Sequence, residues 1–484
     1  MLFSSYFIIR VFGRVDFSAI IFHLQFPLLD NDNSGGFVKS YILRVIAPSV
    51  FCAFCITFPH IIHKCVAWLY AWFLRASLPK FGLAFVLLAL CVNVANNKLK
   101  ISHYLKTQKT YSNLYEAHYK PFEAPLTHTP TQNLIVIFVE SLESTFSAKA
   151  TPLKVANRGG HNESSPSKYS PFGELIPNLS QLALNHTNFS STQRLGGINQ
   201  LSGTGWTIAG TIGYLCGIPL NMPIGGNDFK NKHFLSSAPC ISDILAKLGY
   251  EQVYFSNFDS AFAGNKHFFE AHKVKVLDFP YFQSQNLLPN PMPQSFFGFW
   301  GLKDAKLFEF ARKHLEMMNS KPFAMYISTI DTHSPDGFVD KEFCPNWEQN
   351  YQNAISCSDK IISDFVEFVR TSPFGENTTI VILGDHLSMK QNFFPRDTKR
   401  AIFNAFINAK FTKEPKGTKN RELSHFDITP LLLDSLGIKA EFFGLGRNPL
   451  YHKSLIESEF SIEELNKELG KRNKIYDSFW EVKK

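Results

Sequence analysis

The chain has 484 residues and a formal net charge of +8, and it contains 48 phenylalanines and eight cysteines. This length exceeds that of one typical domain and predicts a multidomain protein. The basic residues are spread along the chain without a dense cluster of lysine, arginine and aromatic residues, so nucleic-acid binding is not expected. A modest basic surplus suits an anionic membrane surface or a phosphate-bearing substrate instead.

The N-terminal part is strongly apolar, and residues 1–97 are predicted to be a membrane anchor with at least two transmembrane helices. Val45–Ile62 is mostly apolar and about long enough to cross a bilayer, although prolines interrupt it, and Phe81–Ala95 is cleaner but shorter. Cys65–Leu74 lies between them and has the aromatic character of a membrane interface. A pair of buried core helices is the alternative. Basic residues flank the second span on both sides, so charge alone leaves the orientation open.

Residues 98–131 are polar and end in prolines, which is typical of a linker. Strands and helices then alternate over residues 132–452, which predicts an α/β catalytic domain with a mostly parallel sheet between helices. The expected strands are Leu134–Val139, Gln252–Phe255, Phe323–Ile330, Ile380–Leu383 and Ile402–Ile407. The expected helices are Ile241–Leu248, Asp304–Met318, Ser358–Arg370 and Ile428–Leu436. Residues 453–484 are charged and helix-prone, and they are expected to form a peripheral tail.

Two of these strands end in side chains that can bind a metal. Ile380–Leu383 is followed by Asp385 and His386, and Leu134–Val139 is followed by Glu140. Open α/β sheets carry their chemistry at the carboxyl ends of strands. An isolated Asp-His pair often occurs by chance, but the second strand and a threonine-containing segment between the two favour a metal site assembled across the sheet.

The threonine-containing segment, Gln200–Pro219, includes the runs Gly-Thr-Gly-Trp-Thr-Ile-Ala-Gly and Cys-Gly-Ile-Pro. It resembles the nucleophile segment of membrane-anchored phosphoglycerol transferases of the alkaline phosphatase/sulfatase superfamily, in particular the type that modifies periplasmic glucans. Lipoteichoic acid synthases and phosphoethanolamine transferases are more distant relatives in this respect. The resemblance spans roughly residues 133–447 and includes four further motifs: Glu140–Glu143, Asp331–Phe338, Asp385–Met389 and Gly444–Arg447.

The resemblance implies an alkaline phosphatase-like fold and a nucleophilic threonine. We expect Thr204 in this role, because Gly203 and Gly205 on either side permit a sharp turn that exposes its hydroxyl. Thr207 is the rival nucleophile, and its alternative role is to pack or cap the helix that begins there. The expected metal ligands are Glu140, Thr204, Asp385 and His386. This mixed nitrogen and oxygen set suits Mn²⁺ or Zn²⁺, with Mg²⁺ possible but less suited to an imidazole.

Further residues are candidates for contact with the substrate. His333 follows a strand, where an imidazole can reach the phosphoryl group or the leaving oxygen, although a lone histidine is more often structural. In relatives, the stretch equivalent to Ser256–His272 contributes substrate contacts. The candidates there and in the last motif are Asn257, Lys266, His272 and Arg447, with Asp427 equally open. Arg447 has the alternative role of fixing the C-terminal edge of the domain.

The implied activity is transfer of phosphoglycerol from phosphatidylglycerol to a glycan through a phospho-threonine, in the bacterial inner membrane with the catalytic domain in the periplasm or outside the cell. The alternatives are a phosphoethanolamine transferase, a sulfatase or phosphodiesterase, and a membrane-anchored glycan-binding protein with a degenerate site. A sulfatase usually needs a cysteine or serine followed by x-Pro/Ala-x-Arg, which Thr204-Gly205-Trp206 does not provide.

Four cysteines lie outside the apolar region: Cys216, Cys240, Cys344 and Cys357. None forms a C-x-x-C zinc pattern, so two disulfides in an oxidising compartment or four free thiols are the alternatives. Of the three possible pairings we expect the one local in sequence, which joins Cys216 to Cys240 and Cys344 to Cys357.

Overall fold

The computed structural model describes residues 6, 42–50, 77–123, 132–148, 173–221, 234–318, 322–395 and 398–481. The predicted first span beyond residue 50 and the interfacial segment Cys65–Leu74 lie outside these residues. Within the described ranges, no helix is both long enough and apolar enough to cross a membrane. The membrane anchor therefore stays a prediction.

A sheet of six strands forms the centre of the α/β domain, in the order β3-β2-β4-β1-β5-β6. All neighbouring strands pair in parallel except β5 and β6, which are antiparallel. This arrangement confirms the predicted mostly parallel sheet. The strands are β1 (Asn133–Val139), β2 (Glu251–Ser256), β3 (Lys275–Leu277), β4 (Phe323–Ser328), β5 (Thr378–Gly384) and β6 (Asn404–Ile407).

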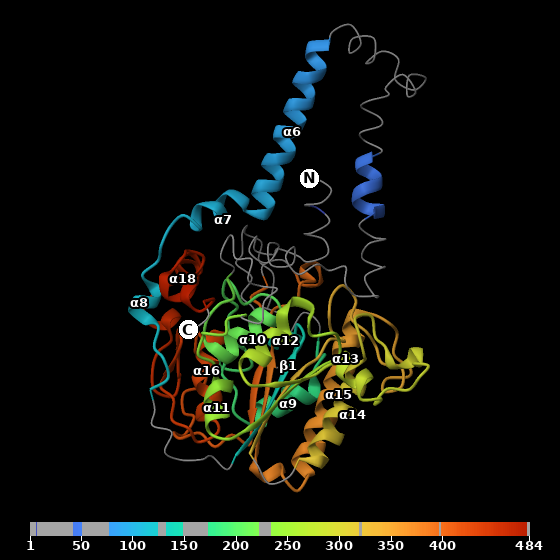
Figure 1. Cartoon of the computed structure of the whole chain (residues 1–484), viewed down its shortest axis with the longest axis vertical. Coiled ribbons are helices and arrows are strands. Elements are labelled where there is room, and N and C mark those ends of the chain that lie inside the picture. The colour runs from blue at the N-terminus through green and yellow to red at the C-terminus, as the bar shows by residue number, and fades with distance from the viewer. Residues whose placement is uncertain are drawn as a thin grey trace, which may run out of the picture.

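Helices cover both faces of the sheet (Figure 1), and the central strand β1 contributes alternate side chains to each face. Leu134, Val136 and Phe138 join one core cluster, which the helices α10 (Thr207–Cys216), α11 (Ile241–Lys247), α12 (Asn265–Ala271) and α16 (His425–Asp434) complete. Ile135, Ile137 and Val139 join the other cluster, together with α9 (Pro177–Asn185), α13 (Phe279–Ser284), α14 (Asp304–Met317) and α15 (Tyr351–Thr371). The strand is buried on both faces, which explains its continuous apolar sequence.

The predicted peripheral tail is in fact part of the core. It forms α17 (Leu455–Ser458), α18 (Ile462–Leu469) and α19 (Lys474–Ser478), and its apolar side chains belong to the same buried cluster as α10 and α16. The prediction was wrong because the charged residues of α18 cover only one side of the helix, while Leu465 and Leu469 on the other side are buried.

The predicted linker is also partly structured. It contains the end of α6 (Ser77–Leu99), α7 (Ile101–Thr107) and α8 (Leu114–His118). Figure 1 shows α6 standing away from the catalytic domain, while α8 lies along its side near α18. The ring centroids of Tyr115 on α8 and Tyr476 on α19 are 5.6 Å apart, so the linker and the C-terminal segment pack against each other.

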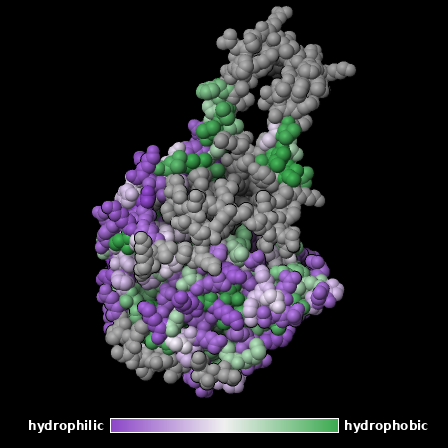
Figure 2. Space-filling model, viewed as in Figure 1, coloured by the Kyte–Doolittle hydropathy of each residue, from purple (hydrophilic) through white to green (hydrophobic). Residues whose placement is uncertain are grey.

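Apolar side chains on α6 are exposed, and Figure 2 shows this region as a green projection above a largely polar surface. Phe85, Val86, Leu88 and Leu90 are each more than half exposed. A row of exposed apolar side chains of this kind marks a surface that binds lipid or another protein.

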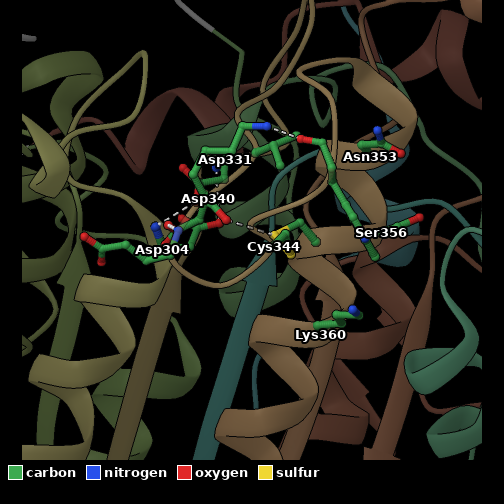
Figure 3. Close-up of a disulfide and its surroundings, with 12 residues drawn as sticks. Asp304, Asp331, Asp340, Cys344, Asn353, Ser356 and Lys360 are labelled. Carbon is green, nitrogen blue, oxygen red and sulfur yellow. Dashed lines mark hydrogen bonds between the residues drawn. A yellow bond between two sulfur atoms is a disulfide. The ribbon is translucent and has the colours of Figure 1, made fainter.

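Both predicted disulfides are present. Cys216, the last residue of α10, is bonded to Cys240 at the start of α11. Cys344, in the loop that follows β4, is bonded to Cys357 on α15 (Figure 3). The structure therefore confirms the sequence-local pairing.

Candidate active site

Three neighbouring strands deliver the candidate residues to one edge of the sheet. Glu140 follows β1, Asp385 and His386 follow β5, and His333 lies in the loop after β4. Because β1 pairs in parallel with both β4 and β5, the carboxyl ends of all three strands meet. The topology thus assembles residues that are far apart in the sequence.

Glu140, Asp385 and His386 form a buried cluster that can hold a metal ion. The His386 Nε2 atom lies 3.6 Å from Glu140 Oε1 and 3.6 Å from Asp385 Oδ2. The other ring nitrogen, Nδ1, donates to the Leu387 carbonyl oxygen at 2.9 Å, which leaves the Nε2 lone pair facing the carboxylates.

Two atoms of this cluster support the metal assignment. Asp385 Oδ2 and His386 Nε2 are fully buried and have no hydrogen-bond partner among the described residues. Leaving such groups unpaired is costly, and a divalent cation between them would satisfy both. The residues present therefore fit a divalent metal, and their nitrogen and oxygen donors suit Mn²⁺ or Zn²⁺.

The protonation of the cluster is consistent with this assignment. Burial, together with the neighbouring Glu140 carboxylate, raises the pKa of Asp385 to about 7. Burial opposes ionisation of Glu140, but His386, His333 and the hydrogen bonds from Ser141 and Thr207 together lower the pKa of that carboxyl. Without a cation the cluster thus retains a proton near neutral pH, which metal binding would release.

Ser141 orients both carboxylates. Its amide donates to Asp385 Oδ1 at 2.8 Å, and its hydroxyl donates to Glu140 Oε1 at 2.6 Å. The residue has a φ of 57°, a left-handed conformation that is uncommon outside glycine and is found at strained functional sites. Sequence analysis placed this serine in a motif without assigning it a role.

The structure contradicts the prediction for Thr204 and favours its rival. Thr204 is fully buried, and its hydroxyl donates to the Leu201 carbonyl oxygen at 2.9 Å within its own turn. Thr207, the first residue of α10, is half-buried, and its hydroxyl donates to Glu140 Oε2 at 3.3 Å. The glycines around Thr204 do create a turn, but the turn directs the later threonine to the metal cluster.

Helix α10 can approach the cluster closely because residue 210 is a glycine. A Cβ atom on Gly210 would lie 2.1 Å from the carbonyl oxygen of Asp385, so any side chain there would push the helix away. The first turn of α10 is therefore pressed against the loop that carries Asp385 and His386. Its free N–H groups are suited to bind a phosphoryl group.

His333 lies at the edge of the cluster. It is half-buried, its Nδ1 atom lies 2.7 Å from the Ser334 carbonyl oxygen, and its proximity helps to lower the pKa of Glu140. The preceding Thr332 donates its hydroxyl to the Glu140 carbonyl oxygen, which ties this loop to the end of β1.

Two of the predicted substrate contacts are instead structural. Asn257 is fully buried, and its amide donates to Asp304 Oδ1 at 2.7 Å at the start of α14. His272 is buried against the disulfide at Cys240, and its Nδ1 atom lies 2.9 Å from Asp243 Oδ2. Both were expected to contact the substrate because the equivalent stretch does so in relatives, but the hydrogen bonds described here are made within the fold.

The other candidates also lie away from the cluster or stay untested. Arg447 donates to Glu459 Oε1 at 2.6 Å and to Ser458 Oγ at 3.1 Å, so it fixes the C-terminal edge, as its alternative role required. Asp427 accepts the Arg447 amide at 3.1 Å and caps α16. Lys266 is half-buried on α12, and its role in substrate binding stays a prediction.

The fold brings a group of residues that can hold a metal ion and a threonine hydroxyl together at one edge of an α/β sheet. The chain belongs to the sulfatase family, whose model matches residues 132–438. It is similar to phosphoglycerol transferase I of Salmonella choleraesuis (strain SC-B67), with 29% identity over 395 residues that cover 79% of this chain and 48% of the relative. The phosphoglycerol transferase I of Escherichia fergusonii is 30% identical over 394 residues, with the same coverage of both chains.

The chain spans about half the length of the curated relatives it matches. Among solved structures, it is similar to the integral membrane lipooligosaccharide phosphoethanolamine transferase A from Neisseria meningitidis. That similarity has a TM-score of 0.49 and 13% identity, and it covers 90% of this chain and 82% of the other.

Proposed function

We propose that this protein transfers a phosphoglycerol group from phosphatidylglycerol to a glycan through a covalent phosphoryl intermediate on Thr207. The observation that carries the proposal is the Thr207 hydroxyl beside Glu140, at the start of α10 and next to two unpaired metal-binding atoms. The two curated relatives named phosphoglycerol transferase I support the choice of head group.

A divalent metal would be held by Glu140, Asp385, His386 and the Thr207 oxygen. When bound, such an ion lowers the pKa of a coordinated hydroxyl and neutralises charge on the phosphoryl oxygens.

In the first half-reaction, the Thr207 oxygen attacks the phosphorus of the lipid diester. Glu140 Oε2 already accepts the hydroxyl hydrogen of Thr207 and is placed to take the proton. The bond between phosphorus and the diacylglycerol oxygen breaks, and His333 donates a proton to that oxygen. The N–H groups of the first turn of α10 stabilise the charge on the phosphoryl oxygens.

In the second half-reaction, a glycan hydroxyl attacks the phosphorus and gives its proton to His333. The bond between phosphorus and the Thr207 oxygen breaks, and the threonine recovers its proton. Donor and acceptor therefore use the same position in turn, which is a ping-pong mechanism.

A membrane location follows from the donor. The exposed apolar side chains of α6 would hold the catalytic domain at a bilayer, where the anchor predicted for residues 1–97 keeps the lipid at a high effective concentration. The two disulfides support a location outside the cytoplasm, in the periplasm or at the outer side of the bacterial inner membrane.

The test uses the full-length protein in phosphatidylglycerol vesicles with Mn²⁺ and a gluco-oligosaccharide. We expect release of diacylglycerol, a phosphoglycerol-bearing glycan, and a mass increase on the peptide that contains Thr207 when the acceptor is omitted. Thr207→Ala should abolish all three, while Thr204→Ala, the matched control, should retain them.

Activity in Thr207→Ala that is lost in Thr204→Ala would return the nucleophile to Thr204. Diacylglycerol released only from phosphatidylethanolamine would replace the head group and support the phosphoethanolamine alternative.

A further inference from the structure

Two exposed aromatic rings lie next to His333 on a short loop. Trp300 is 39% exposed and Phe299 is 56% exposed. The centroid of the Trp300 ring lies 4.5 Å from that of His333, and the Phe299 ring packs edge-on against Phe338 at 5.6 Å. Neither aromatic residue takes part in the chemistry proposed above.

Backbone contacts hold the loop that carries them. Phe297 and Leu302 pair as an antiparallel bridge, and the Gly298 amide donates to the Gly301 carbonyl oxygen at 2.8 Å. A Cβ atom on Gly301 would lie 2.5 Å from the Asn257 carbonyl oxygen, so the loop is pressed against the end of β2. The two rings are therefore presented to solvent from a loop whose ends are hydrogen-bonded to each other and packed on the end of β2.

The base of the loop is locked to the segment that carries His333. The Asp304 amide donates to Asp331 Oδ2 at 2.9 Å, and the Asp331 amide donates to Asp304 Oδ2 at 3.1 Å. Lys303 and Asp340 form a buried ion pair at 3.0 Å beside them (Figure 3 shows the three aspartates together). Trp300 and His333 are thus fixed relative to each other by two reciprocal hydrogen bonds.

We propose that Trp300, assisted by Phe299, is the acceptor subsite, on which a sugar ring of the glycan stacks with its apolar face. This inference rests on the proposed function and names the part of the site that selects the acceptor. A flat aromatic ring beside the residue that accepts the glycan proton would place a sugar hydroxyl within reach of His333.

The surroundings favour a sugar over a lipid chain. Asp336 lies on the same loop as His333 and pairs with Lys390 at 2.6 Å, and its side chain is 63% exposed. A sugar presents hydroxyl groups that can bond to such charged side chains while its C–H face covers an aromatic ring. An acyl chain would instead leave these charges without water or partners.

The test separates the two half-reactions in the full-length protein. Release of diacylglycerol from phosphatidylglycerol vesicles without acceptor measures the first, and the dependence of transfer on gluco-oligosaccharide concentration measures the second. Trp300→Ala should raise the half-saturating concentration of the oligosaccharide about tenfold and leave diacylglycerol release within about twofold. Trp300→Tyr, which keeps a ring, should recover most of the loss.

Met317→Ala is the control, because it removes an exposed apolar side chain from the opposite end of α14.

Binding of the oligosaccharide to Thr207→Ala protein, measured by calorimetry with and without Trp300→Ala, gives a readout that does not need turnover. Equal binding in both would overturn the subsite. A parallel loss of diacylglycerol release and transfer in Trp300→Ala would assign the ring to the lipid or to support of His333. Absence of diacylglycerol release in the unmodified protein would contradict the proposed function, while the binding arm would still decide the subsite.

Discussion

Asp385 and His386 each have one polar atom tied to the backbone and one directed into the cluster. Asp385 Oδ1 accepts the amides of Ser141 and His386, and His386 Nδ1 lies against the Leu387 carbonyl oxygen. The backbone thus fixes the orientation of both side chains before any ion binds, as supporting contacts do in metal sites. What remains for an ion is the pair of unsatisfied atoms, Asp385 Oδ2 and His386 Nε2.

Metal content should therefore depend on Asp385. Asp385→Asn removes one negative charge and one strong oxygen donor, so affinity for Mn²⁺ or Zn²⁺ should fall by more than about a hundredfold, with loss of transfer. Elemental analysis of the purified protein measures this. Asp336→Asn, at an exposed aspartate, should keep its metal, and stoichiometric metal in Asp385→Asn would remove the cluster from consideration.

His425 should make the protein less stable in acid. It is fully buried beneath the site, its Nε2 atom lies 2.8 Å from the Asp385 carbonyl oxygen, and burial lowers its pKa from 6.5 to about 4. The unfolded chain therefore binds a proton that the folded protein does not, and stability falls as the pH drops from about 6.5 to about 4. The loss should reach roughly 3 kcal/mol.

Denaturant unfolding of the full-length protein in detergent at pH 7, 5.5 and 4.5 measures this loss. His425→Gln keeps a donor near the Asp385 carbonyl oxygen but does not titrate, so its stability should change less over the same range. An equal pH dependence of the two proteins would show that another group is responsible.

The metal-binding candidates were predictable from the sequence, whereas the choice between the two threonines was not. Glu140, Asp385 and His386 could be inferred because the carboxyl edge of a parallel sheet brings them together. The choice between Thr204 and Thr207 depends on which hydroxyl the turn directs toward the cluster. The backbone conformation of the two intervening residues, Gly205 and Trp206, decides this, and the sequence does not give that conformation.

At the scale of helices and strands, the longer elements could be predicted from the sequence and the shortest could not. The strands β1, β4 and β5 and the helix α14 have long, clear patterns, and they lie close to their predicted bounds. The three-residue β3 and the six-residue α13 are too short for periodicity to identify. The helix α15 begins before its predicted start because Asn350 caps it, accepting the Asn353 amide at 2.9 Å.

The disulfide between α10 and α11 should stabilise the element that carries Thr207. The bonded cysteines are separated by 24 positions in the sequence. Replacing Cys216 and Cys240 by serine removes this cross-link, which should lower the free energy of unfolding by roughly 3 kcal/mol. Cys91→Ser is the matched control, since Cys91 is a free cysteine on α6 and half-buried. Denaturant midpoints that agree among all three proteins would contradict this expectation.

At the scale of the whole molecule, the segments before and after the sheet hold each other. The Arg472 amide donates to the Thr110 carbonyl oxygen at 3.0 Å, and the Ser112 amide donates to that of Arg472 at 2.9 Å. These segments were predicted to be a linker and a peripheral tail. Contacts between residues so far apart in the sequence leave no local pattern from which the pairing could be predicted. Their pairing fixes α8 to the C-terminal helices and so to the α/β domain.

The Asn473 side chain joins these two segments. It is buried, its amide donates to the Ser112 carbonyl oxygen at 2.8 Å and to Glu116 Oε2 at 2.6 Å, and its Oδ1 atom accepts the amides of Ile475 and Tyr476 to cap α19.

Asn473→Ala removes all four hydrogen bonds of this side chain at once, so the unfolding free energy should fall by about 2–3 kcal/mol. The amides of residues 110–120 and 471–480 should then exchange hydrogen faster, while those of β1 keep their protection. Hydrogen exchange read by mass spectrometry measures both, and Lys474→Ala, at the exposed neighbouring position, should leave them unchanged. If the variant exchanged faster only at 471–480, Asn473 would be a helix cap alone, and the linker would be held by the aromatic contacts of Tyr115.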